Sequence, residues 1–337
     1  MEAFEEFEFK FFKNIEESTT YAYHQGVNSF CLFWSVDRIL YLIYANNVNS
    51  IISYDLNNDK KINEIKRAHS KYITSFRHYL DGNNKRDLVL SVSTENNNVK
   101  VWNIKNYECL CNIKNIYEKS VILSACFVNE NNKNFIVTGN EPYKIFEEIK
   151  VFELNGNKCK EIYNYDDLTH FIDSYYDKNS SKNFIITGNA SYPRSYDYSN
   201  NQLYHKYSDD NNKNQYYMVF FDKDDILKLI ECNQDYYIRI WDFHSGKLIN
   251  KIKISDSVYF KVYSLYVSTN NYLFVGTCEG VILKIDLKTQ KIISFFKDQS
   301  GVFGIQLIDH PRYGECLVIK GFAGCKIQLW TKNKKNL

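Results

Sequence analysis

The feature of this sequence that most limits its fold is a short unit that recurs seven times. Each unit has a run of alternating apolar and polar residues, then an aromatic or aliphatic residue, then a polar one, as in YIRIWDF at Tyr237–Phe243. Successive copies are 44 to 50 residues apart. The matched pairs are Tyr54 and Asp55, Trp102 and Asn103, Phe152 and Glu153, Tyr196 and Asp197, Trp241 and Asp242, Ile285 and Asp286, and Trp330 and Thr331. This period is typical of four-stranded propeller blades and longer than that of ankyrin or tetratricopeptide repeats.

Each unit also contains four candidate strands. Around Trp102 these are YITSFRHYL, DLVLSVS, VKVWNI and ECLCNIKNI, and two of the turns between them are rich in Asn. Asparagine tolerates the left-handed backbone that turns require, which suits a chain with only 13 Gly and 3 Pro. Alternation of period two is common along the chain and helical periodicity is rare, so the sequence predicts an all-β protein.

The two ends of the sequence are expected to form one blade together. After KIQLWTK at residues 326–332 only NKKNL remains, so the seventh unit lacks a fourth strand. The segment FEFKFFKNI precedes the first unit, and its Phe7, Phe9 and Phe11 share one face at strand spacing. We expect this segment to pair onto the seventh unit and close the ring, which removes an unpaired sheet edge. An amphipathic helix is the alternative.

The predicted fold class is an all-β, seven-bladed β-propeller of four-stranded antiparallel blades, with the ring closed by the N-terminal strand pairing onto the last blade. We expect a single domain over residues 1–337, because a ring of repeats explains a length that would otherwise suggest two domains. After a closing strand and lead-in at 1–20, the expected blades are 21–66, 67–117, 118–165, 166–207, 208–254, 255–298, and 299–337 with the N-terminal strand.

The second unit resembles the WD-repeat β-propeller family. AHSKYITSF is similar to that family's Gly-His element, with Ala in place of Gly, and its His69 precedes Trp102 by 33 residues. The resemblance implies a buried hydrogen-bonded network formed by His69, Ser91 or Ser93, Asn96 or a neighbour, and Trp102. These residues are therefore expected to hold the fold together.

The fifth unit resembles the same family through Asp235, which lies six residues before Trp241. It has no matching His ahead of its first strand, and the sixth unit has Ile285 in the Trp position. The resemblance covers the whole chain through period and strand order. It implies that Asp235 and Trp241 are structural, and that the chain binds other proteins as most such propellers do.

Composition narrows the classes of partner. Lys and Arg total 42 and Asp and Glu total 40, so the formal net charge of +2 predicts no nucleic-acid partner. No stretch approaches the 18 or so apolar residues of a membrane helix, and the acidic start is unlike a signal peptide. Nine Cys without regular spacing predict reduced thiols and a cytoplasmic or nuclear location.

Catalytic and metal-binding motifs are missing from the sequence, which predicts that the chain is not an enzyme and has no cofactor. HSGKL at His244–Leu248 looks superficially like a phosphate loop but lacks the first Gly and the Ser or Thr after the Lys, so we interpret it as a turn between strands. Cys109 and Cys111 lie at strand spacing and share a face, but a metal site needs two more ligands. Buried packing is the expected role of these cysteines.

The predicted function is a scaffold or adaptor that binds protein or peptide partners through propeller loops, either as a monomer or as a subunit of a larger complex. Turns between the second and third strands and linkers between blades share one face, called here the top face. The longest step places extra residues in Gly139–Lys150, where Tyr143 and Phe146 are candidate partner-binding residues. Other candidates on this face are Lys71, Tyr72, Tyr192, Tyr236, Tyr259 and Phe303.

Three alternatives stay open on the sequence. The candidate aromatic residues could instead pack within or between blades. A propeller enzyme would require several Asp, Glu or His side chains to converge at the central channel. Recruitment to phosphoinositide membranes would require a paired-arginine motif, and SFRHYLDG has the single Arg77.

Overall fold

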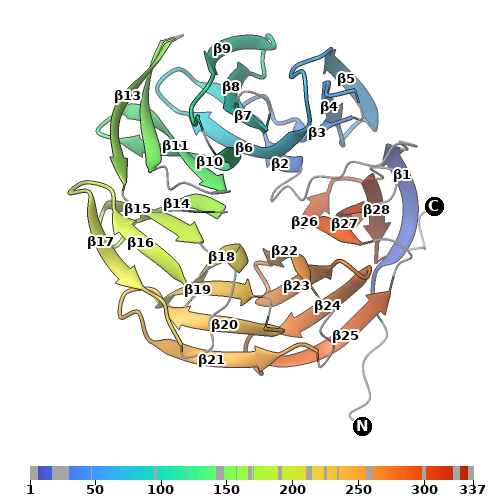
Figure 1. Ribbon diagram of the computed structural model, residues 1–337. Helices are drawn as coiled ribbons and strands as arrows, with labels where there is room; N and C mark the ends of the chain where they lie inside the picture. The colour runs from blue at the N-terminus through green and yellow to red at the C-terminus, as the bar shows by residue number, and fades with distance from the viewer. Residues whose placement is uncertain are drawn as a thin grey trace.

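The chain forms a ring of seven four-stranded antiparallel sheets in a computed structural model (Figure 1), which confirms the predicted fold class. No helix occurs in the described part of the chain. The described residues are 7–16, 30–46, 48–94, 97–118, 120–141, 148–156, 158–165, 169, 171–188, 192–209, 215–223, 226–233, 235–255, 261–297, 301–321 and 327–332.

The strands follow the chain from the innermost to the outermost position of each blade (Figure 1). Blades 1 and 2 consist of β2 (Phe30–Trp34), β3 (Leu40–Ala45), β4 (Ile51–Asp55), β5 (Lys60–Ile65), β6 (Ile73–Asp81), β7 (Arg86–Ser93), β8 (Asn98–Asn103) and β9 (Glu108–Ile113). Blades 3 and 4 consist of β10 (Val121–Glu130), β11 (Lys133–Glu141), β12 (Ile149–Asn155), β13 (Lys158–Tyr165), β14 (Phe171–Asp177), β15 (Lys182–Gly188), β16 (Pro193–Asp197) and β17 (Gln202–Lys206). Blades 5 and 6 consist of β18 (Gln215–Lys223), β19 (Ile226–Asn233), β20 (Tyr237–Asp242), β21 (Leu248–Lys253), β22 (Val262–Val267), β23 (Tyr272–Thr277), β24 (Val281–Asp286) and β25 (Lys291–Lys297). Blade 7 consists of β26 (Val302–His310), β27 (Gly314–Gly321), β28 (Ile327–Thr331) and the N-terminal β1 (Lys10–Glu16).

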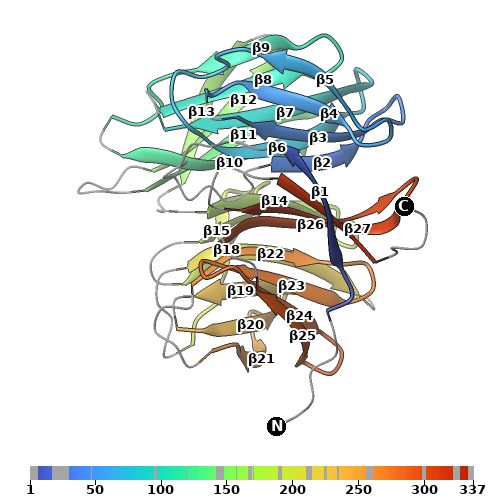
Figure 2. The same cartoon turned by 90° about the vertical axis from the view of Figure 1, so that its right-hand side faces the viewer.

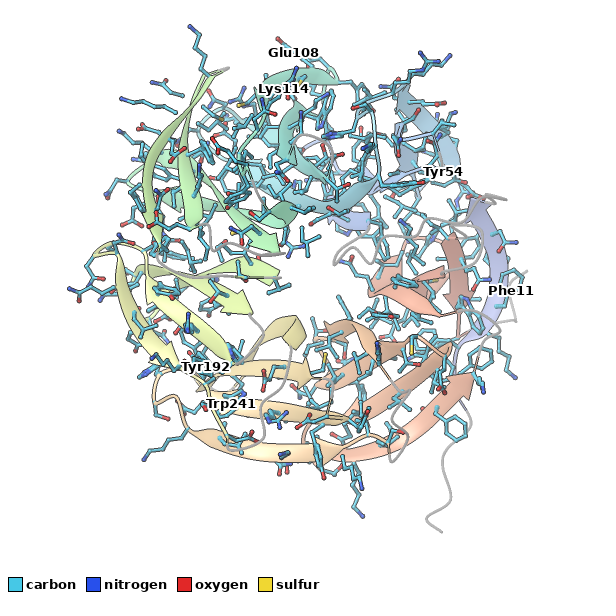
Figure 3. All side chains as sticks on the ribbon, viewed as in Figure 1. Phe11, Tyr54, Glu108, Lys114, Tyr192 and Trp241 are labelled. Atoms are coloured by element: carbon cyan, nitrogen blue, oxygen red, sulfur yellow. The ribbon has the colours of Figure 1, made fainter. Side chains whose placement is uncertain are left out.

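The N-terminal strand closes the ring as predicted. β1 pairs antiparallel with β28 and is the outermost strand of blade 7, as the side view in Figure 2 shows. Phe7, Phe9 and Phe11 lie on the side of this segment that faces blade 6, as expected, because the Phe11 ring contacts Trp330, which clusters with Phe7 and Phe9. The three residues differ in burial. Phe7 and Phe9 precede the paired strand and are buried between blades 6 and 7, whereas Phe11 is exposed at the outer edge of the ring (Figure 3).

The repeat seen in the sequence corresponds to a bulge that recurs in every blade. In each sheet the register between the third and fourth strands shifts by one residue next to the aromatic or aliphatic reference residue, such as Trp102 or Trp241. The unpaired residues of the fourth strands are Ile62, Leu110, Ile162, Tyr204, Ile249, Ile293 and, in β1, Phe12. The closing strand therefore carries the same irregularity opposite Trp330 that the other six blades have.

This bulge also changes the sides to which two cysteines point. Cys109 pairs with Trp102 and Cys111 with Val101, and Leu110 is the extra residue between them. Cys109 is exposed and Cys111 is buried, so the expectation that both share one face is wrong. An extra residue breaks the period of two on which that expectation depended.

The polar residue after each reference residue shapes the next turn. The side-chain oxygen of Asp55 accepts hydrogen bonds from the backbone N–H of Asn57 and Asn58, at 2.8 and 3.2 Å. Asp242 accepts one from Ser245 N at 2.8 Å, and Gly246 then adopts a positive φ of 67°. HSGKL is therefore the turn between β20 and β21, as predicted.

The apolar core is divided among the seven blade interfaces. Val89 and Trp102 pack toward blade 1, whereas Leu88 and Leu90 pack toward blade 3, so both faces of the sheet are buried. The same division is repeated around the ring, with one cluster of buried residues at each interface. In second strands such as β7, residues on both sides of the strand are therefore buried, including Ser91 and Ser93.

Candidate functional site

Consecutive strands of a blade run in opposite directions, so the segments that join them lie alternately on two opposite faces of the ring. The top face carries the turns between second and third strands and the linkers between blades. The opposite, bottom face carries the turns between first and second strands and between third and fourth strands. Because all blades have the same strand order, every segment of one kind lies at the same face.

The predicted partner-binding residues of the top face are not gathered into one site. Lys71 and Tyr72 are exposed on the linker before blade 2, whereas Tyr192 and Tyr236 are half-buried in blades 4 and 5. The Tyr192 ring is covered by Arg194 and Lys206, whose cationic groups lie 5.0 and 5.8 Å from its centroid. Tyr143, Phe146 and Tyr259 lie outside the described residues.

Phe303 does not fit a partner-binding role. It is the bulge residue of β26 and is only 7% exposed. Its ring stacks on Tyr263, the bulge residue of β22 in the neighbouring blade, with centroids 4.6 Å apart. The bulge turns this side chain into the interface between blades 6 and 7, where packing uses it.

A buried hydrogen-bonded chain links the His, Ser and Trp of blade 2. The indole Nε1 of Trp102 donates to Ser91 Oγ at 2.8 Å, and His69 Nε2 lies 2.7 Å from the same oxygen. Burial, and then the charge of Lys100, lower the pKa of His69 to about 3. The imidazole is therefore neutral at pH 7 and ties the linker before blade 2 to the sheet. Asn96 lies outside the described residues.

Blade 3 builds an equivalent link from different residues. Thr138 pairs with Lys150 in the β-ladder as Ser91 pairs with Lys100 in blade 2. The Tyr117 hydroxyl lies 2.8 Å from Thr138 Oγ1 and also donates to Thr138 O at 2.8 Å. A tyrosine from the preceding linker thus takes the place that His69 has in blade 2.

Blade 5 replaces the same network with charged groups. Glu231 faces Arg239 in the ladder, at the position that Ser91 has opposite Lys100, and both side chains are fully buried. Arg239 Nε donates to Asp209 Oδ2 at 2.7 Å, and Arg239 Nη1 donates to Asp235 Oδ1 at 3.1 Å. Asp209, from the linker before the blade, lies near the place of His69. Figure 3 shows Trp241 within the same blade.

Glu231 is the unsatisfied member of this network. Burial raises the pKa of its carboxyl to about 8, against the opposing effect of Arg239. Its two oxygens and Trp241 Nε1 form no hydrogen bond of good geometry among the described groups, and the nearby indole N–H lowers the pKa of Glu231 less than burial raises it. The nearest cation is Arg239, whose Nε lies 3.7 Å from Glu231 Oε1. Arg239 is balanced instead by the hydrogen-bonded Asp209 and Asp235, which leaves Glu231 mostly protonated at pH 7.

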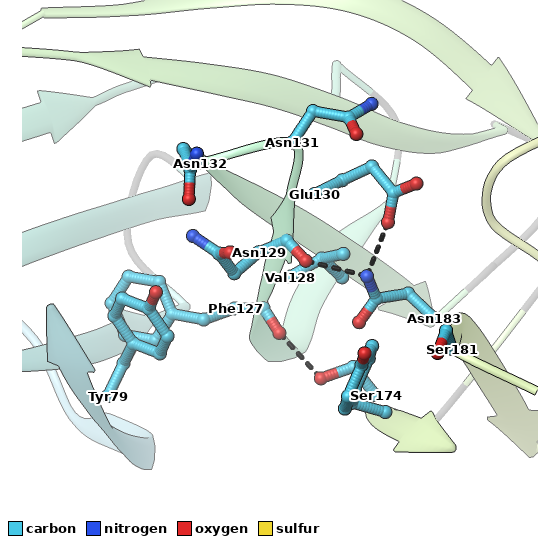
Figure 4. A pocket seen from close by; sticks show the side chains of 11 residues that line it. Tyr79, Phe127, Val128, Asn129, Glu130, Asn131, Asn132, Ser174, Ser181 and Asn183 are labelled. Carbon is cyan, nitrogen blue, oxygen red and sulfur yellow. Dashed lines mark hydrogen bonds between the residues drawn. The ribbon is translucent and has the colours of Figure 1, made fainter. Parts of the chain in front are cut away.

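A pocket of about 510 Å³ opens on the bottom face where blades 2, 3 and 4 meet (Figure 4). Blade 3 contributes most of its lining through the end of β10 and the following turn. The lining residues are Tyr79 from blade 2, Phe127, Val128, Asn129, Glu130, Asn131 and Asn132 from blade 3, and Ser174, Tyr176, Ser181 and Asn183 from blade 4. Both residues of the blade 3 turn have positive φ, 52° for Asn131 and 61° for Asn132, which asparagine tolerates.

Hydrogen bonds between blades hold the pocket wall in place. Ser174 Oγ donates to Phe127 O at 2.5 Å. Asn183 Nδ2 donates to Asn129 O at 2.6 Å and to Glu130 Oε2 at 2.5 Å (Figure 4). The first strand of blade 3 is thus fixed to the first two strands of blade 4. A pre-formed wall of this kind lowers the entropy that a ligand loses on binding.

Large apolar side chains are exposed at the bottom-face turns of blades 1, 2 and 4. Tyr176 lines the pocket, whereas Leu80 follows Tyr79 in β6 and points to the opposite side of that strand; each side chain is 51% exposed. Trp34 and Val36 are exposed at the corresponding turn of blade 1. We call Trp34, Val36, Leu80 and Tyr176 the apolar rim. These exposed apolar side chains are on the same face as the pocket.

The sequence analysis did not predict the pocket, because asparagines such as Asn131 and Asn132 are also the residues expected in an ordinary turn. The turn NENNKN between β10 and β11 is one of several Asn-rich turns, and its composition alone predicts only turn geometry. One usable signal was present. Tyr79 and Tyr176 lie near the ends of the first strands of their units, where a strand end does not require aromatic residues.

Arg77, the single arginine considered for a phosphoinositide motif, is not among the residues that line the pocket. Arg77 Nη2 donates to Asp173 Oδ2 at 3.2 Å, and its guanidinium lies 5.8 Å from the Phe171 ring, so it bridges blades 2 and 4. Within the described ranges no three His, Cys, Asp or Glu side chains are placed to hold a metal ion. The same ranges contain no helix long and apolar enough to span a membrane.

No profile of a known protein family matches this chain, and no curated protein matches it either. The seven-bladed ring is therefore established by the structure, and no matched relative supports membership of the WD-repeat family. The blade 2 network resembles that family's pattern, whereas blades 3 and 5 have other residues in the same places.

Proposed function

We propose that this protein is a WD-repeat-like propeller that acts as a non-catalytic scaffold, and that it binds a protein or peptide partner on the bottom face of blades 1 to 4. The observation that supports this most is the pocket at blades 2, 3 and 4, on the face that also carries the apolar rim. Rigid rings of sheets commonly present binding segments for other proteins. The proposed binding surface is therefore the bottom face, whereas the candidate residues of the sequence analysis lie on the top face.

The rest of the structure supports a scaffold in a reducing compartment. The eight cysteines in the described ranges are free thiols. The charged network of blade 5 is centred on Glu231 and Arg239. Both side chains are fully buried, which favours a structural role over a reaction with a substrate. We therefore propose a cytoplasmic or nuclear adaptor that works as a subunit of a larger complex.

Proximity labelling with paired variants tests the binding face. The bottom-face variant is Leu80→Ser with Tyr176→Ala, and the matched top-face control is Val48→Ser with Tyr72→Ala, all at exposed side chains. Both variants should keep thermal stability close to that of the parent, because exposed substitutions usually cost less than about 0.5 kcal/mol. Quantitative mass spectrometry should show a set of proteins lost only from the bottom-face variant. Loss of the same proteins only from the top-face control would refute the proposal.

A further inference from the structure

The pocket has one charged lining residue, and that residue is an acid. Glu130 stands among asparagines, serines and aromatic rings. The two lysines that follow the pocket turns are engaged elsewhere, Lys133 with Glu153 at 2.9 Å and Lys182 with Asp197 at 2.7 Å. Within the described residues no lysine, arginine or histidine forms an ion pair with Glu130, whose described hydrogen bond is to a neutral amide.

The Asn183 amide orients the Glu130 carboxylate without neutralising it. Asn183 Nδ2 is itself fixed by Asn129 O, so the 2.5 Å bond to Glu130 Oε2 holds the carboxylate in one position. Figure 4 shows the second carboxylate oxygen directed away from Asn183. An acceptor held in this way is ready to receive an N–H donor from a ligand, and a cationic donor forms the stronger bond.

The aromatic residues of the pocket suit the same kind of ligand. Tyr79 and Phe127 lie with ring centroids 5.2 Å apart, and Tyr176 is exposed on the blade 4 side. Aromatic faces attract lysine and arginine side chains, and their apolar stems pack against such rings. This chain uses the same contact internally, where Lys284 Nζ lies 4.0 Å from the Tyr272 ring centroid. The pocket volume of about 510 Å³ is within the range of ligand sites and exceeds what one long side chain fills.

From these observations we infer that the pocket binds a lysine or arginine side chain of the partner, with Glu130 pairing with its charge and the apolar rim receiving neighbouring apolar residues of the same segment. This inference rests on the proposed function, because it assigns the chemistry that the binding face recognises. The asparagines of the turn are then placed to hydrogen-bond the backbone of the bound segment.

The test uses the full-length chain and a random heptapeptide display library. Peptides are selected on the parent protein, and the affinity of each synthetic peptide is measured by fluorescence anisotropy. The proteins compared are the parent, Glu130→Gln, Tyr176→Ala and the matched control Glu161→Gln, which removes one carboxylate from the outer strand of the same blade. Glutamine at position 130 retains an oxygen that can accept from Asn183. Each peptide is also made with citrulline for arginine or norleucine for lysine.

We expect the selected peptides to share a basic residue and to lose about tenfold in affinity with Glu130→Gln or with the neutral replacement. The two changes together should cost no more than either alone, and Glu161→Gln should have no effect. Peptides that depend on Tyr176 but are indifferent to Glu130→Gln would overturn the inference and leave the proposed binding face standing. If no recovered peptide depends on Tyr176, both the inference and the binding face are overturned.

Discussion

At the residue scale, equivalent positions in blades 2, 3 and 5 are occupied by different types of residue. Ser91 in blade 2, Thr138 in blade 3 and Glu231 in blade 5 occupy one register position of the second strand. Ser91 and Thr138 connect their sheets to the linker that enters the blade through His69 and Tyr117, whereas in blade 5 Arg239, opposite Glu231, makes this connection to Asp209. What is repeated is the connection between linker and sheet, whereas the residue types differ from blade to blade.

Ser91→Ala should destabilise the protein by about 1 to 3 kcal/mol. The substitution removes the oxygen shared by Trp102 Nε1 and His69 Nε2 and leaves both groups buried without that partner. Urea unfolding followed by tryptophan fluorescence measures the change. The control is Ser93→Ala in the same strand, where the hydroxyl makes a long 3.4 Å bond to Lys71 O. Equal losses in the two variants would contradict the role given to Ser91.

Glu231→Gln should remove a decline of stability in mild alkali. Burial raises the pKa of Glu231 to about 8, above the value of the unfolded chain, so its contribution is fully present below about pH 4.5 and is lost as the pH rises through 8. Between pH 7 and 9 this amounts to roughly 1 kcal/mol. Unfolding measured at pH 7, 8 and 9 checks it. A decline of the same size in the variant would show that another group is responsible.

At the element scale, the first described segment behaves as the fourth strand of a blade. β1 has the bulge common to all fourth strands, with Phe12 unpaired between Phe11 and Lys13. Lys13 forms an ion pair with Asp59 of blade 1, and Glu8 accepts from Lys284 Nζ of blade 6 at 2.5 Å. The segment therefore joins blade 7 to both of its neighbours.

Phe9→Ala should cost about 3 to 5 kcal/mol, whereas Phe11→Ala should cost less than about 1 kcal/mol. Phe9 is 2% exposed and its ring contacts Phe274 edge to face, with centroids 6.0 Å apart, whereas Phe11 is 46% exposed. The two variants are matched in residue type and lie two residues apart, so differences in the unfolded state largely cancel. Thermal unfolding compares them, and similar melting temperatures would contradict the burial of Phe9.

The elements show how far sequence could predict this fold. The seven reference residues were found because each lies beside the recurring bulge, and the closing strand was found because the last unit lacked a partner. The side of Cys109 was not found, because the bulge at Leu110 interrupts the period of two. The pocket was not found, because Asn131 and Asn132 would be chosen for turn geometry whether or not they bind a ligand.

At the scale of the whole molecule, the fold depends on contacts between neighbours in a ring. Each of the seven apolar clusters belongs to one blade interface. No central core compensates for a lost interface within the described residues. Removing one strand therefore affects two neighbouring interfaces and also leaves a sheet edge unpaired.

Deleting residues 1–16 should lower the melting temperature more than Phe9→Ala does and should cause self-association. The deletion removes Phe7 and Phe9 from the blade 6 and 7 interface and exposes the edge of β28. Calorimetry and size-exclusion chromatography measure the two effects. A synthetic peptide of residues 7–16 should reverse both by pairing with β28, and a scrambled peptide should not. A monomeric, equally stable deletion variant would contradict the closing role of β1.

The pairing of β1 with β28 also has a consequence for how the protein is made. The two partners are separated by almost the whole chain, since Glu16 pairs with Ile327. A ribosome that adds about 5 to 20 residues per second needs roughly 15 to 60 s to synthesise the intervening chain. During that time the nascent protein holds an apolar segment, including Phe7 and Phe9, whose partner does not yet exist. We therefore expect that this segment requires protection by chaperones during translation, and that the ring closes only after β28 has been synthesised.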